Sequence, residues 1–399
     1  MSVDDEIIRV AARGDGVTAD GRHVPLAAPG DRLLADGSLA KGPNHRNAPC
    51  KHFPACGGCQ LQHLDDAAWS DFIVERIAGA LKAHGLQTEI RTPLLSPPRT
   101  RRRATLHAER RGRQVHLGFT EPASHRLIDL DECWVLNPEL FALLAPLRGL
   151  LGALMPGSRR VNVHLAMTDQ GRDVLIDGLE AEGLAAAEAL NGFAGRHKLA
   201  RLAIDEGLGP QPRWEPEPVT VTLGGVAVPF PGGSFLQATP EGEAALVAAV
   251  REIIGDADAV ADLFAGLGTF TFALPKARVY AAEAARDPIL SLKAAAAQAR
   301  RQVFVDHRDL YRRPVQPKDL NHFGAVVLDP PRAGAKEQAV ELAASTVPVI
   351  AYVSCNPSTF GRDTETLSQG GYHLDWVQPV GQFRWSTHVE LAAKFSRQG

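Results

Sequence analysis

The chain has 399 residues, of which 45% are apolar and 22% charged, and its formal net charge is −3. This length predicts two or three domains, since a domain usually holds roughly 100 to 200 residues, and the composition excludes wholesale disorder and fibrous repeats. The longest apolar stretch, residues 140–155, is interrupted by Pro146 and Arg148 and is too short for a membrane span. The acidic N-terminus does not resemble a signal peptide, so we expect a cytoplasmic protein that contacts no membrane.

Short strands, a helix and a hairpin are predicted for the first third of the chain. Residues 1–42 hold brief apolar segments between turn glycines and are too few for a self-sufficient domain. Apolar residues recur at helical spacing from residue 65 to residue 85, which predicts a helix. Residues 105–108 and 115–118 flank a polar turn and predict a β-hairpin.

The middle of the chain predicts one helix and two pairs of strands, at 138–156, at 160–166 with 172–177, and at 219–223 with 226–230. Before the second pair, the proline-rich stretch 210–218 predicts a connector between layers. From Thr239 onward, helices and strands alternate in the manner of a doubly wound parallel sheet, which predicts a Rossmann-like α/β domain. Its main elements are expected at 240–254 (helix), 259–263 (strand), 279–282 (strand), 286–300 (helix), 303–305 (strand), 325–328 (strand), 336–345 (helix) and 348–353 (strand).

A glycine-rich turn follows the first strand of this domain, in Asp-Leu-Phe-Ala-Gly-Leu-Gly-Thr at residues 262–269. Glycines let the backbone approach a ligand closely, and ligands of such sheets bind beyond the carboxyl ends of the strands. The second strand ends in Glu283, where an acid can accept hydrogen bonds from ribose hydroxyls. The third glycine of the dinucleotide fingerprint is missing, which favours S-adenosylmethionine over a dinucleotide. A glycine turn without any ligand is the alternative.

Two motifs end the fourth and fifth strands, Asp-Pro-Pro-Arg at 329–332 and Ser-Cys-Asn-Pro at 354–357. A lone buried cysteine is usually a small apolar residue, but Cys355 stands at a strand end beside the expected methyl donor and is a candidate nucleophile. Addition of a thiolate to C6 of uracil makes C5 able to attack a methyl group, and a base must then remove the C5 proton. Glu390 is the candidate base, although a glutamate near a C-terminus is more often a surface charge.

Four of the five cysteines lie in the first third of the chain, at Cys50, Cys56, Cys59 and Cys133. In a large chain without a signal peptide, clustered thiols indicate a metal site or catalysis rather than disulfides. Four thiolates can bind zinc or an iron–sulfur cluster. Only Cys56 and Cys59 have the Cys-x2-Cys spacing of zinc sites, which favours a [4Fe-4S] cluster over zinc.

A basic patch lies between residues 91 and 130, where nine arginines face only three acidic residues. A charge run is ordinarily a solvated surface, but this one is also suited to the phosphates of RNA. The candidates for RNA contact are Arg99, Arg101, Arg102, Arg103, Arg110, Arg111 and Arg113.

The chain resembles the bacterial uracil-5 RNA methyltransferases, which make 5-methyluridine, over about residues 43–395. The resemblance rests on the cysteine spacing, on Ser-Phe-Leu-Gln at 234–237, on the glycine-rich turn, on the two strand-end motifs and on His-Val-Glu at 388–390. It implies a class I S-adenosylmethionine-dependent fold, an iron–sulfur cluster, Cys355 as the nucleophile and Glu390 as the base. It also implies that the donor and the uracil are bound by Gln237, Phe264, Gly266, Gly268, Glu283, Asp309 and Asp329.

Three domains follow from this resemblance. They are a shortened β-barrel-like RNA-binding remnant over 1–42, an α+β domain with the cysteines and the basic hairpin over 43–235, and a methyltransferase domain over 236–399. We favour 23S rRNA over tRNA as the substrate because of the cysteine cluster, and we expect a monomer. Two rival hypotheses are an amino-group methyltransferase, which normally has an aromatic residue where Arg332 stands, and a non-catalytic RNA-binding module.

Overall fold

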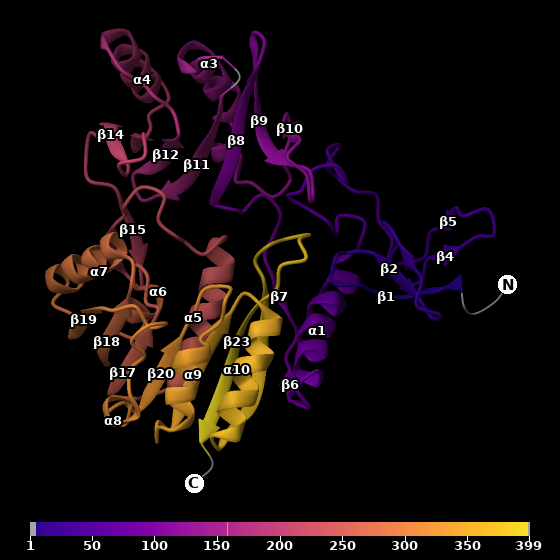
Figure 1. Cartoon of the computed structure of the whole chain (residues 1–399), viewed down its shortest axis with the longest axis vertical. Helices are drawn as coiled ribbons and strands as arrows, with labels where there is room; N and C mark the ends of the chain where they lie inside the picture. The colour runs from indigo at the N-terminus through magenta and orange to yellow at the C-terminus, as the bar shows by residue number, and fades with distance from the viewer. Residues whose placement is uncertain (1–4, 158, 398–399) are drawn as a thin grey trace.

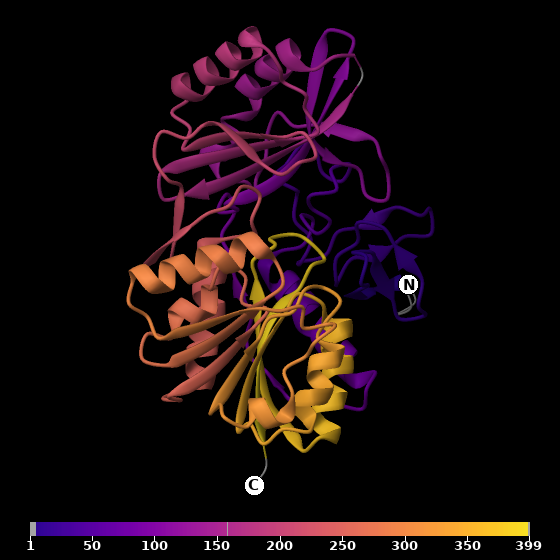
Figure 2. The same cartoon turned by 60° about the vertical axis from the view of Figure 1, so that its left-hand side comes forward.

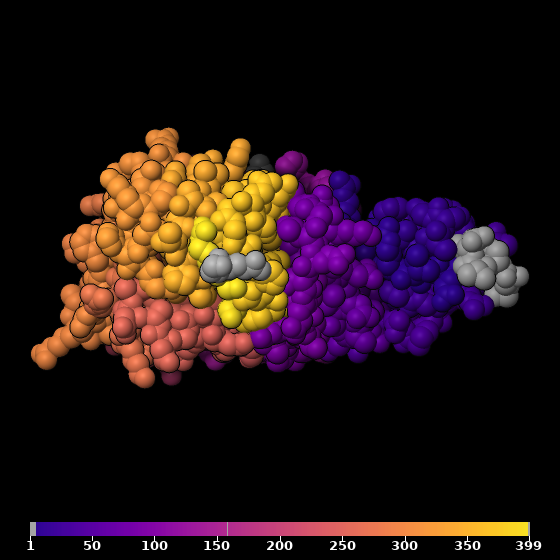
Figure 3. All heavy atoms as spheres, turned by 90° about the horizontal axis from the view of Figure 1, so that it is seen from below, coloured from indigo at the N-terminus to yellow at the C-terminus, as the bar shows by residue number. Residues whose placement is uncertain are grey.

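The computed structural model describes residues 5–157 and 159–397, so that residues 1–4 and 398–399 of the first and last predicted domains lie outside it. The chain forms a small N-terminal piece, a central domain and a larger domain built on a mixed sheet (Figures 1 and 2). Seen from below, the purple part of the chain lies between the indigo N-terminal piece and the orange and yellow C-terminal domain (Figure 3). No helix among the described residues is long and apolar enough to cross a membrane.

The larger domain contains a nine-stranded sheet of order β19-β18-β17-β20-β21-β23-β22-β6, with β7 also paired to β22. Strands β17 to β21 are parallel to one another, whereas β23 runs antiparallel to both β21 and β22. The strands are β6 (Glu89–Ile90), β7 (Leu94–Leu95), β17 (Ala259–Leu263), β18 (Arg278–Glu283), β19 (Val303–His307), β20 (Ala325–Leu328), β21 (Val349–Ser354), β22 (Tyr372–Gly381) and β23 (Glu390–Arg397).

Helices cover both faces of this sheet because its central strands are apolar on both sides. In β17, Ala261 and Leu263 face one core together with α1, α9 and α10, while Val260 faces the other core with α5, α6 and α7. Strand β20 is buried along its whole length. The helices of this domain are α1 (Asp66–Lys82), α5 (Pro240–Ile254), α6 (Thr269–Ala273), α7 (Arg286–Gln298), α8 (Pro317–Leu320), α9 (Lys336–Ala343) and α10 (Pro357–Gln369).

Helix α1 and strands β6 and β7 belong to this larger domain although they precede the central domain in the chain. Trp69 and Phe72 of α1 share a core with Phe360 of α10. The two helices cross closely, since a Cβ at Gly361 would lie 2.8 Å from the carbonyl oxygen of Ala80. The hairpin of β15 (Thr220–Leu223) and β16 (Val226–Pro229) also packs on this domain. The larger domain thus includes segments on the N-terminal side of the boundary predicted at residue 236.

The central domain is a seven-stranded sheet of order β10-β9-β8-β11-β12-β13-β14 that packs against α3 and α4. Its parallel pair is β12 with β13, joined through α4. Its elements are β8 (Arg103–Arg111), β9 (Gln114–Thr120), β10 (Leu127–Asp129), α2 (Pro138–Phe141), α3 (Leu144–Leu154), β11 (Arg160–Thr168), β12 (Gly171–Asp177), α4 (Leu184–Arg196), β13 (Arg201–Asp205) and β14 (Gln211–Trp214).

Two details of this domain differ from the sequence prediction. The helix predicted over 138–156 is two helices, because Leu143 N bonds to Leu140 O and closes α2 with a tight turn. The stretch 210–218 is not purely a connector, because it contains β14, which pairs with β13 at the end of the sheet. An edge strand accommodates Pro212, which has no N–H to donate to a further strand.

The N-terminal piece contains two small antiparallel ladders within residues 5–40. One has three strands and the other two, and an isolated bridge between Glu6 and Arg32 connects them. Ile7 and Val17 are buried in the three-stranded ladder. The strands are β1 (Ile7–Val10), β2 (Gly16–Thr18), β3 (His23–Val24), β4 (Arg32–Leu33) and β5 (Leu39–Ala40).

Candidate active site

A cavity of about 420 Å³ lies at the carboxyl ends of the parallel strands of the larger domain. This is the edge where ligands of doubly wound sheets bind. Both candidate catalytic residues and six of the seven candidate donor or uracil contacts line it: Cys355, Glu390, Gln237, Phe264, Gly266, Glu283, Asp309 and Asp329. The remaining candidate, Gly268, does not line the cavity, although its neighbours Leu267 and Thr269 do.

The glycine-rich turn between β17 and α6 has the left-handed conformation at three positions. Phe264, Gly266 and Gly268 have φ angles of 65°, 55° and 96°. A Cβ at Gly268 would lie 2.8 Å from the Phe272 ring, so this glycine is required for packing of the turn rather than for contact with the cavity. The turn therefore brings main chain close to the ligand space, while Phe264 and Leu267 of the same turn also line it.

Glu283 at the end of β18 is held by two main-chain amides. Gly266 N donates to its Oε2 at 2.9 Å, and Ala285 N donates to its Oε1 at 2.7 Å. Each carboxylate oxygen keeps a further lone pair that can accept a hydrogen bond from a hydroxyl group. The carboxylate is thus fixed in orientation while it remains able to accept hydrogen bonds from a bound sugar.

Two carboxyl groups of the cavity, those of Asp329 and Glu390, have raised pKa values. Burial and then the charges of Glu390 and Asp262 raise the pKa of Asp329 well above its ordinary value. Burial raises the pKa of Glu390 to about 7, against the opposing hydrogen bond from Gln382. A carboxyl group with a pKa near the working pH can both accept and release a proton, which is the property a general base needs.

The protein groups around Cys355 favour the neutral form of its thiol. Burial, followed by the charges of Glu390 and Asp329, raises its pKa to about 11. The guanidinium of Arg332 opposes this shift, and its Nη2 lies 2.5 Å from Nδ1 of His388. A positively charged ligand beside Cys355 and the carboxylates would likewise favour the thiolate.

Gln382, which directly follows β22, connects three parts of the site. Its Nε2 donates to Oε1 of Gln237 at 2.8 Å and to Oε2 of Glu390 at 2.6 Å. Its Oε1 accepts from Ala238 N at 2.8 Å, which fixes the orientation of the amide because a main-chain N–H can only donate. The sequence analysis missed this function, because no local pattern distinguishes a buried glutamine in a loop.

Tyr311 is a second lining residue that the sequence analysis missed. Its ring lies 5.5 Å from that of Phe264 at an interplanar angle of 55°, and its hydroxyl donates to Gly334 O at 3.1 Å. Its position two residues after Asp309, at the carboxyl end of β19, is a signal that could have indicated it.

Two of the arginines predicted to bind RNA, Arg102 and Arg103, make contacts between the two larger domains. Arg102 Nε donates to Gln237 O at 3.0 Å, and the same side chain forms an ion pair with Glu243 of α5. Arg103 donates to the carbonyl oxygen of Leu236. Arg101, beside them, is half-buried and donates to Arg103 O at 3.1 Å. Arg102 and Arg103 therefore hold the segment before α5 against the central domain.

The other four arginines lie nearer the surface. Arg99, Arg111 and Arg113 are exposed, whereas Arg110 is half-buried and donates to Met155 O at 2.6 Å. The guanidinium of Arg99 lies 4.3 Å from the centre of the Trp134 ring. Of the three exposed arginines, Arg111 forms an ion pair with Glu109 at 3.2 Å.

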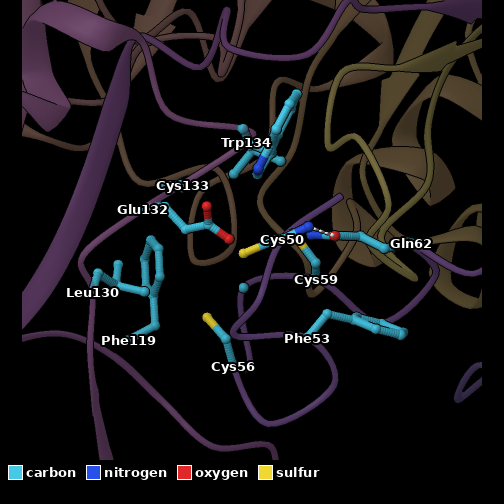
Figure 4. A pocket seen from close by; sticks show the side chains of 12 residues that line it. Cys50, Phe53, Cys56, Cys59, Gln62, Phe119, Leu130, Glu132, Cys133 and Trp134 are labelled. Atoms are coloured by element: carbon cyan, nitrogen blue, oxygen red, sulfur yellow. Dashed lines mark hydrogen bonds between the residues drawn. The ribbon is translucent and has the colours of Figure 1, made fainter. Parts of the chain in front are cut away.

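The four clustered cysteines, which we call the cysteine centre, line one pocket although Cys133 is far from the others in sequence. Figure 4 shows Cys50 and Cys56 directing their sulfur atoms into this pocket, beneath Trp134. Burial raises the pKa of Cys50 to about 11 and that of Cys59 to about 12. Neutral buried thiols of this kind become thiolates when a metal binds.

The donor set fits a soft metal centre. The pocket walls carry four thiols and mostly apolar side chains and no histidine, and sulfur ligands of this type select zinc or iron–sulfur clusters. The indole Nε1 of Trp385, which packs on Cys59, is buried without a hydrogen-bond partner among the described residues. Within 5–157 and 159–397, however, no three or more His, Cys, Asp or Glu side chains are arranged to hold a metal ion.

Comparison with known proteins shows to which family the chain belongs. The family model of the tRNA (uracil-5-)-methyltransferases matches residues 226–398. An uncharacterized RNA methyltransferase of Zymomonas mobilis is 48% identical over 394 residues, which cover 98% of this chain and 99% of that protein. The chain belongs to the uracil-5 RNA methyltransferase family. The family predicted from the motifs is confirmed, and membership of it favours a uracil-5 RNA methyltransferase over the two rival hypotheses, an amino-group methyltransferase and a non-catalytic RNA-binding module.

Two further similar proteins have names that specify the RNA. The 23S rRNA (uracil(1939)-C(5))-methyltransferase of Erwinia tasmaniensis is 28% identical over 415 residues, which cover 99% of this chain and 90% of that enzyme. The solved structure of Pyrococcus abyssi tRNA (uracil-54, C5)-methyltransferase with S-adenosyl-L-homocysteine has a TM-score of 0.75 and 22% identity, with 98% of this chain and 99% of that chain covered. The latter confirms the predicted class I methyltransferase fold.

Proposed function

We propose that this uracil-5 RNA methyltransferase uses Cys355 as a covalent nucleophile, Glu390 as a base and S-adenosylmethionine as the methyl donor. The observation that carries the proposal is that Cys355, Glu390 and Asp329, from three different strand ends, line one cavity. Convergence of a thiol and a carboxyl group with a pKa of about 7 is what addition to C6 and proton removal from C5 require.

The chemistry begins with the thiolate of Cys355 forming a bond to C6 of the uracil, which places negative charge on the C4 oxygen and C5. C5 then forms a bond to the methyl carbon, and the electron pair of the broken bond stays on the donor sulfur, which becomes neutral. Glu390 takes the proton from C5, the C5–C6 double bond re-forms and the thiolate leaves. The thiol proton of Cys355 is lost to water before the addition, the C5 proton passes to Glu390, and the donor sulfur keeps the electron pair of the broken bond, so that the reaction balances.

Charge explains how a thiol with a high pKa becomes reactive in this scheme. Asp329 and Glu390 disfavour the thiolate of Cys355, whereas Arg332 favours it. The donor carries one positive charge on its sulfonium, so that its binding offsets the carboxylates around Cys355. Donor binding therefore prepares the nucleophile, and addition to uracil is expected to follow it.

The donor contacts are assigned to the residues around the glycine-rich turn. Glu283 accepts hydrogen bonds from the ribose hydroxyls, the main chain at Gly266 lies against the ligand, and Phe264, Asp309 and Gln237 complete the walls of the site. Asp329 is placed between the donor and the uracil. Replacement of Glu283 by Gln would weaken donor binding, which calorimetry with S-adenosylmethionine measures directly.

We favour 23S rRNA as the substrate, with tRNA as the alternative. Support comes from the rRNA enzyme of Erwinia tasmaniensis, whose similarity extends over nearly the whole chain, including the cysteine-bearing half. The target uridine must be turned out of its stack to reach the cavity, and Arg99, Arg111 and Arg113 are exposed for contact with phosphates. Such contacts provide affinity rather than sequence specificity.

We further propose that Cys50, Cys56, Cys59 and Cys133 hold a [4Fe-4S] cluster with a structural function. A zinc site needs all four sulfur atoms within roughly 2.3 Å of one point. The four thiols share one pocket, and only Cys56 and Cys59 have the Cys-x2-Cys spacing that is typical of zinc sites, which favours a cluster over zinc. Iron, sulfide and zinc analysis of protein purified without oxygen distinguishes the two groups.

Nucleoside mass spectrometry tests the proposed reaction and its substrate together. Ribosomal and transfer RNA are digested separately from cells that lack this protein, from cells with the wild-type chain and from cells with Cys355→Ala. We expect 5-methyluridine to disappear from rRNA without the protein and to return only with the wild-type chain. Its disappearance from tRNA alone would identify the alternative substrate, and its return with Cys355→Ala would refute the covalent mechanism.

A further inference from the structure

The loop between β22 and β23, residues 382–389, has an active-site residue at each end. Gln382 precedes it directly after β22, and Glu390 begins β23 directly after it. Their side chains are bonded to each other at 2.6 Å, and both are more than 95% buried. The position of the proposed base therefore depends on where this loop, which we call the base loop, is held.

The middle of the base loop is held by the turn that carries Cys56 and Cys59. Gln60 N and Leu61 N both donate to the carbonyl oxygen of Trp385, at 2.8 and 2.9 Å. The side chain of Gln60 adds a second link, since its Nε2 donates to Gly57 O at 2.7 Å and its Oε1 accepts from Thr387 N at 3.4 Å. Main chain immediately after Cys59 is thus bonded to main chain five residues before Glu390.

The side chain of Trp385 makes the same connection through packing. It is 3% exposed and forms a small core with Cys59 and Val135, against which Cys133 also packs. Its backbone has a φ of 58°, a left-handed conformation that is costly for a residue with a Cβ. Such a conformation persists only where the surroundings impose it, and here the surroundings are the cysteine centre.

Neighbouring residues of the base loop attach it to other elements. Arg384 donates to Ser96 O at 3.0 Å, pairs with Asp66 of α1 at 2.5 Å and lies over the rings of Trp69 and Trp385. These contacts do not involve the cysteines, so they can keep the loop folded when the link to the cysteine centre is weakened. The link between Gln60 and Trp385 then determines where the base loop lies, whereas the contacts of Arg384 keep the loop folded.

We propose that the cysteine centre sets the position of the catalytic base, through Gln60 and Trp385 as positioning residues that hold the base loop. The inference rests on the proposed function, in which Glu390 removes the C5 proton. It gives the cysteines a function in one step of the reaction without any electron transfer. It predicts a selective defect: methyl transfer proceeds, but the bond between Cys355 and C6 is slow to break because Glu390 is misplaced.

The defect is visible as a covalent intermediate. Total RNA from cells that lack this protein is incubated with S-adenosylmethionine labelled in the methyl group, and labelled protein–RNA adduct is measured by denaturing gel electrophoresis. Glu390→Gln is the benchmark, since without the base the adduct cannot resolve. We expect Trp385→Ala and Gln60→Ala to accumulate adduct as well, with release slowed about 10-fold or more, because misplacement of a reacting group by about 1 Å can cost about 100-fold.

Matched variants separate positioning from folding. Trp214→Ala removes a tryptophan of the central domain that does not touch the base loop, and it should leave no adduct. Trp385→Phe keeps the apolar contact with Cys59 and should resolve the adduct at nearly the wild-type rate. If Trp385→Ala fails to fold, Gln60→Ala, which removes only a half-buried side chain, provides the same readout.

Three outcomes are distinguishable. Adduct in Glu390→Gln, Trp385→Ala and Gln60→Ala supports the inference. Adduct in Glu390→Gln alone, with both positioning variants resolving normally, overturns the inference and leaves the proposed function intact. Absence of adduct in Glu390→Gln, when the wild type methylates the same RNA, overturns the proposed function itself.

Discussion

The active-site cavity and the cysteine centre are both pockets of buried titratable groups, but they are built differently. In the cavity, Asp329 and Cys355 directly follow parallel strands of one sheet, which hold them in place, and only Glu390 also depends on the base loop. In the cysteine centre, the thiols come from irregular loops, and Cys133 approaches from beyond the basic hairpin. We therefore expect the active-site cavity to keep its shape when one side chain is removed. The shape of the cysteine centre, in contrast, should depend on the group that the four thiols are proposed to bind.

The largest effect is expected at the nucleophile. Cys355→Ala should lower methylation by about 10⁴-fold or more, since no other group in the scheme can form the bond to C6. Its unfolding temperature should stay within a few degrees of the wild type, because the strand end is held by the sheet. Single-turnover assays and thermal unfolding measure the two effects. Residual activity near the wild-type level would contradict the covalent scheme.

A substitution in the cysteine centre is expected to lower stability, in contrast to Cys355→Ala. Cys59→Ala should lower the unfolding temperature by about 5 °C or more and abolish binding of the proposed cluster, because a structural metal contributes directly to folding. Removal of the metal from the wild type by a chelator should reproduce the loss. Circular dichroism and metal analysis check this, and a metal-free protein that unfolds at the wild-type temperature would show that the centre has no structural function.

A smaller effect is expected on the pH dependence of kcat when the hydrogen bond from Gln382 to Glu390 is removed. Because only ionised Glu390 can accept the proton, kcat should rise with pH through about 7, the pKa of this carboxyl group. The hydrogen bond from Gln382 lowers this pKa, so Gln382→Leu should move the rise to higher pH and reduce kcat at pH 7 by about 10-fold. An unchanged pH profile would mean that Glu390 is not the titrating base.

The smallest effects are expected among the arginines, and they should divide by position. Arg113→Ala should weaken RNA binding a fewfold and reduce the salt dependence of log K by about one unit, with no change in stability. Arg102→Ala should instead lower the free energy of unfolding by about 2 kcal/mol, since it leaves Glu243 without its partner in a partly buried pair. Filter binding at several salt concentrations and urea unfolding distinguish them.

The helices and strands of the methyltransferase domain could be predicted from sequence because apolar residues recur there at the spacing of helices and strands. Strands β17 and β20 and helix α5 lie where the apolar pattern indicated, and strand ends such as those at Asp329 and Cys355 must then share one edge of the sheet. The partners of the base loop could not be predicted. Gln60 and Thr387 are 327 residues apart, and the left-handed backbone of Trp385 has no signature in a non-glycine residue.

The arginines illustrate a second limit. A run of positive charge predicts a surface, but it does not reveal which side chains the fold turns inward. Arg102 and Arg103 meet the segment before α5 only because the central domain is placed against the methyltransferase domain by tertiary contacts. The cysteine spacing, in contrast, was enough to predict that four thiols would gather around one pocket.

Trapping with 5-fluorouridine tests the central claim most directly. Fluorine at C5 cannot be removed as a proton is, so the enzyme should remain attached to RNA that contains this nucleotide once the methyl group has been transferred. We predict a donor-dependent adduct whose digested peptide carries the methylated fluorouridine on Cys355. Absence of an adduct with an active enzyme, or an adduct on any other residue, would contradict the account.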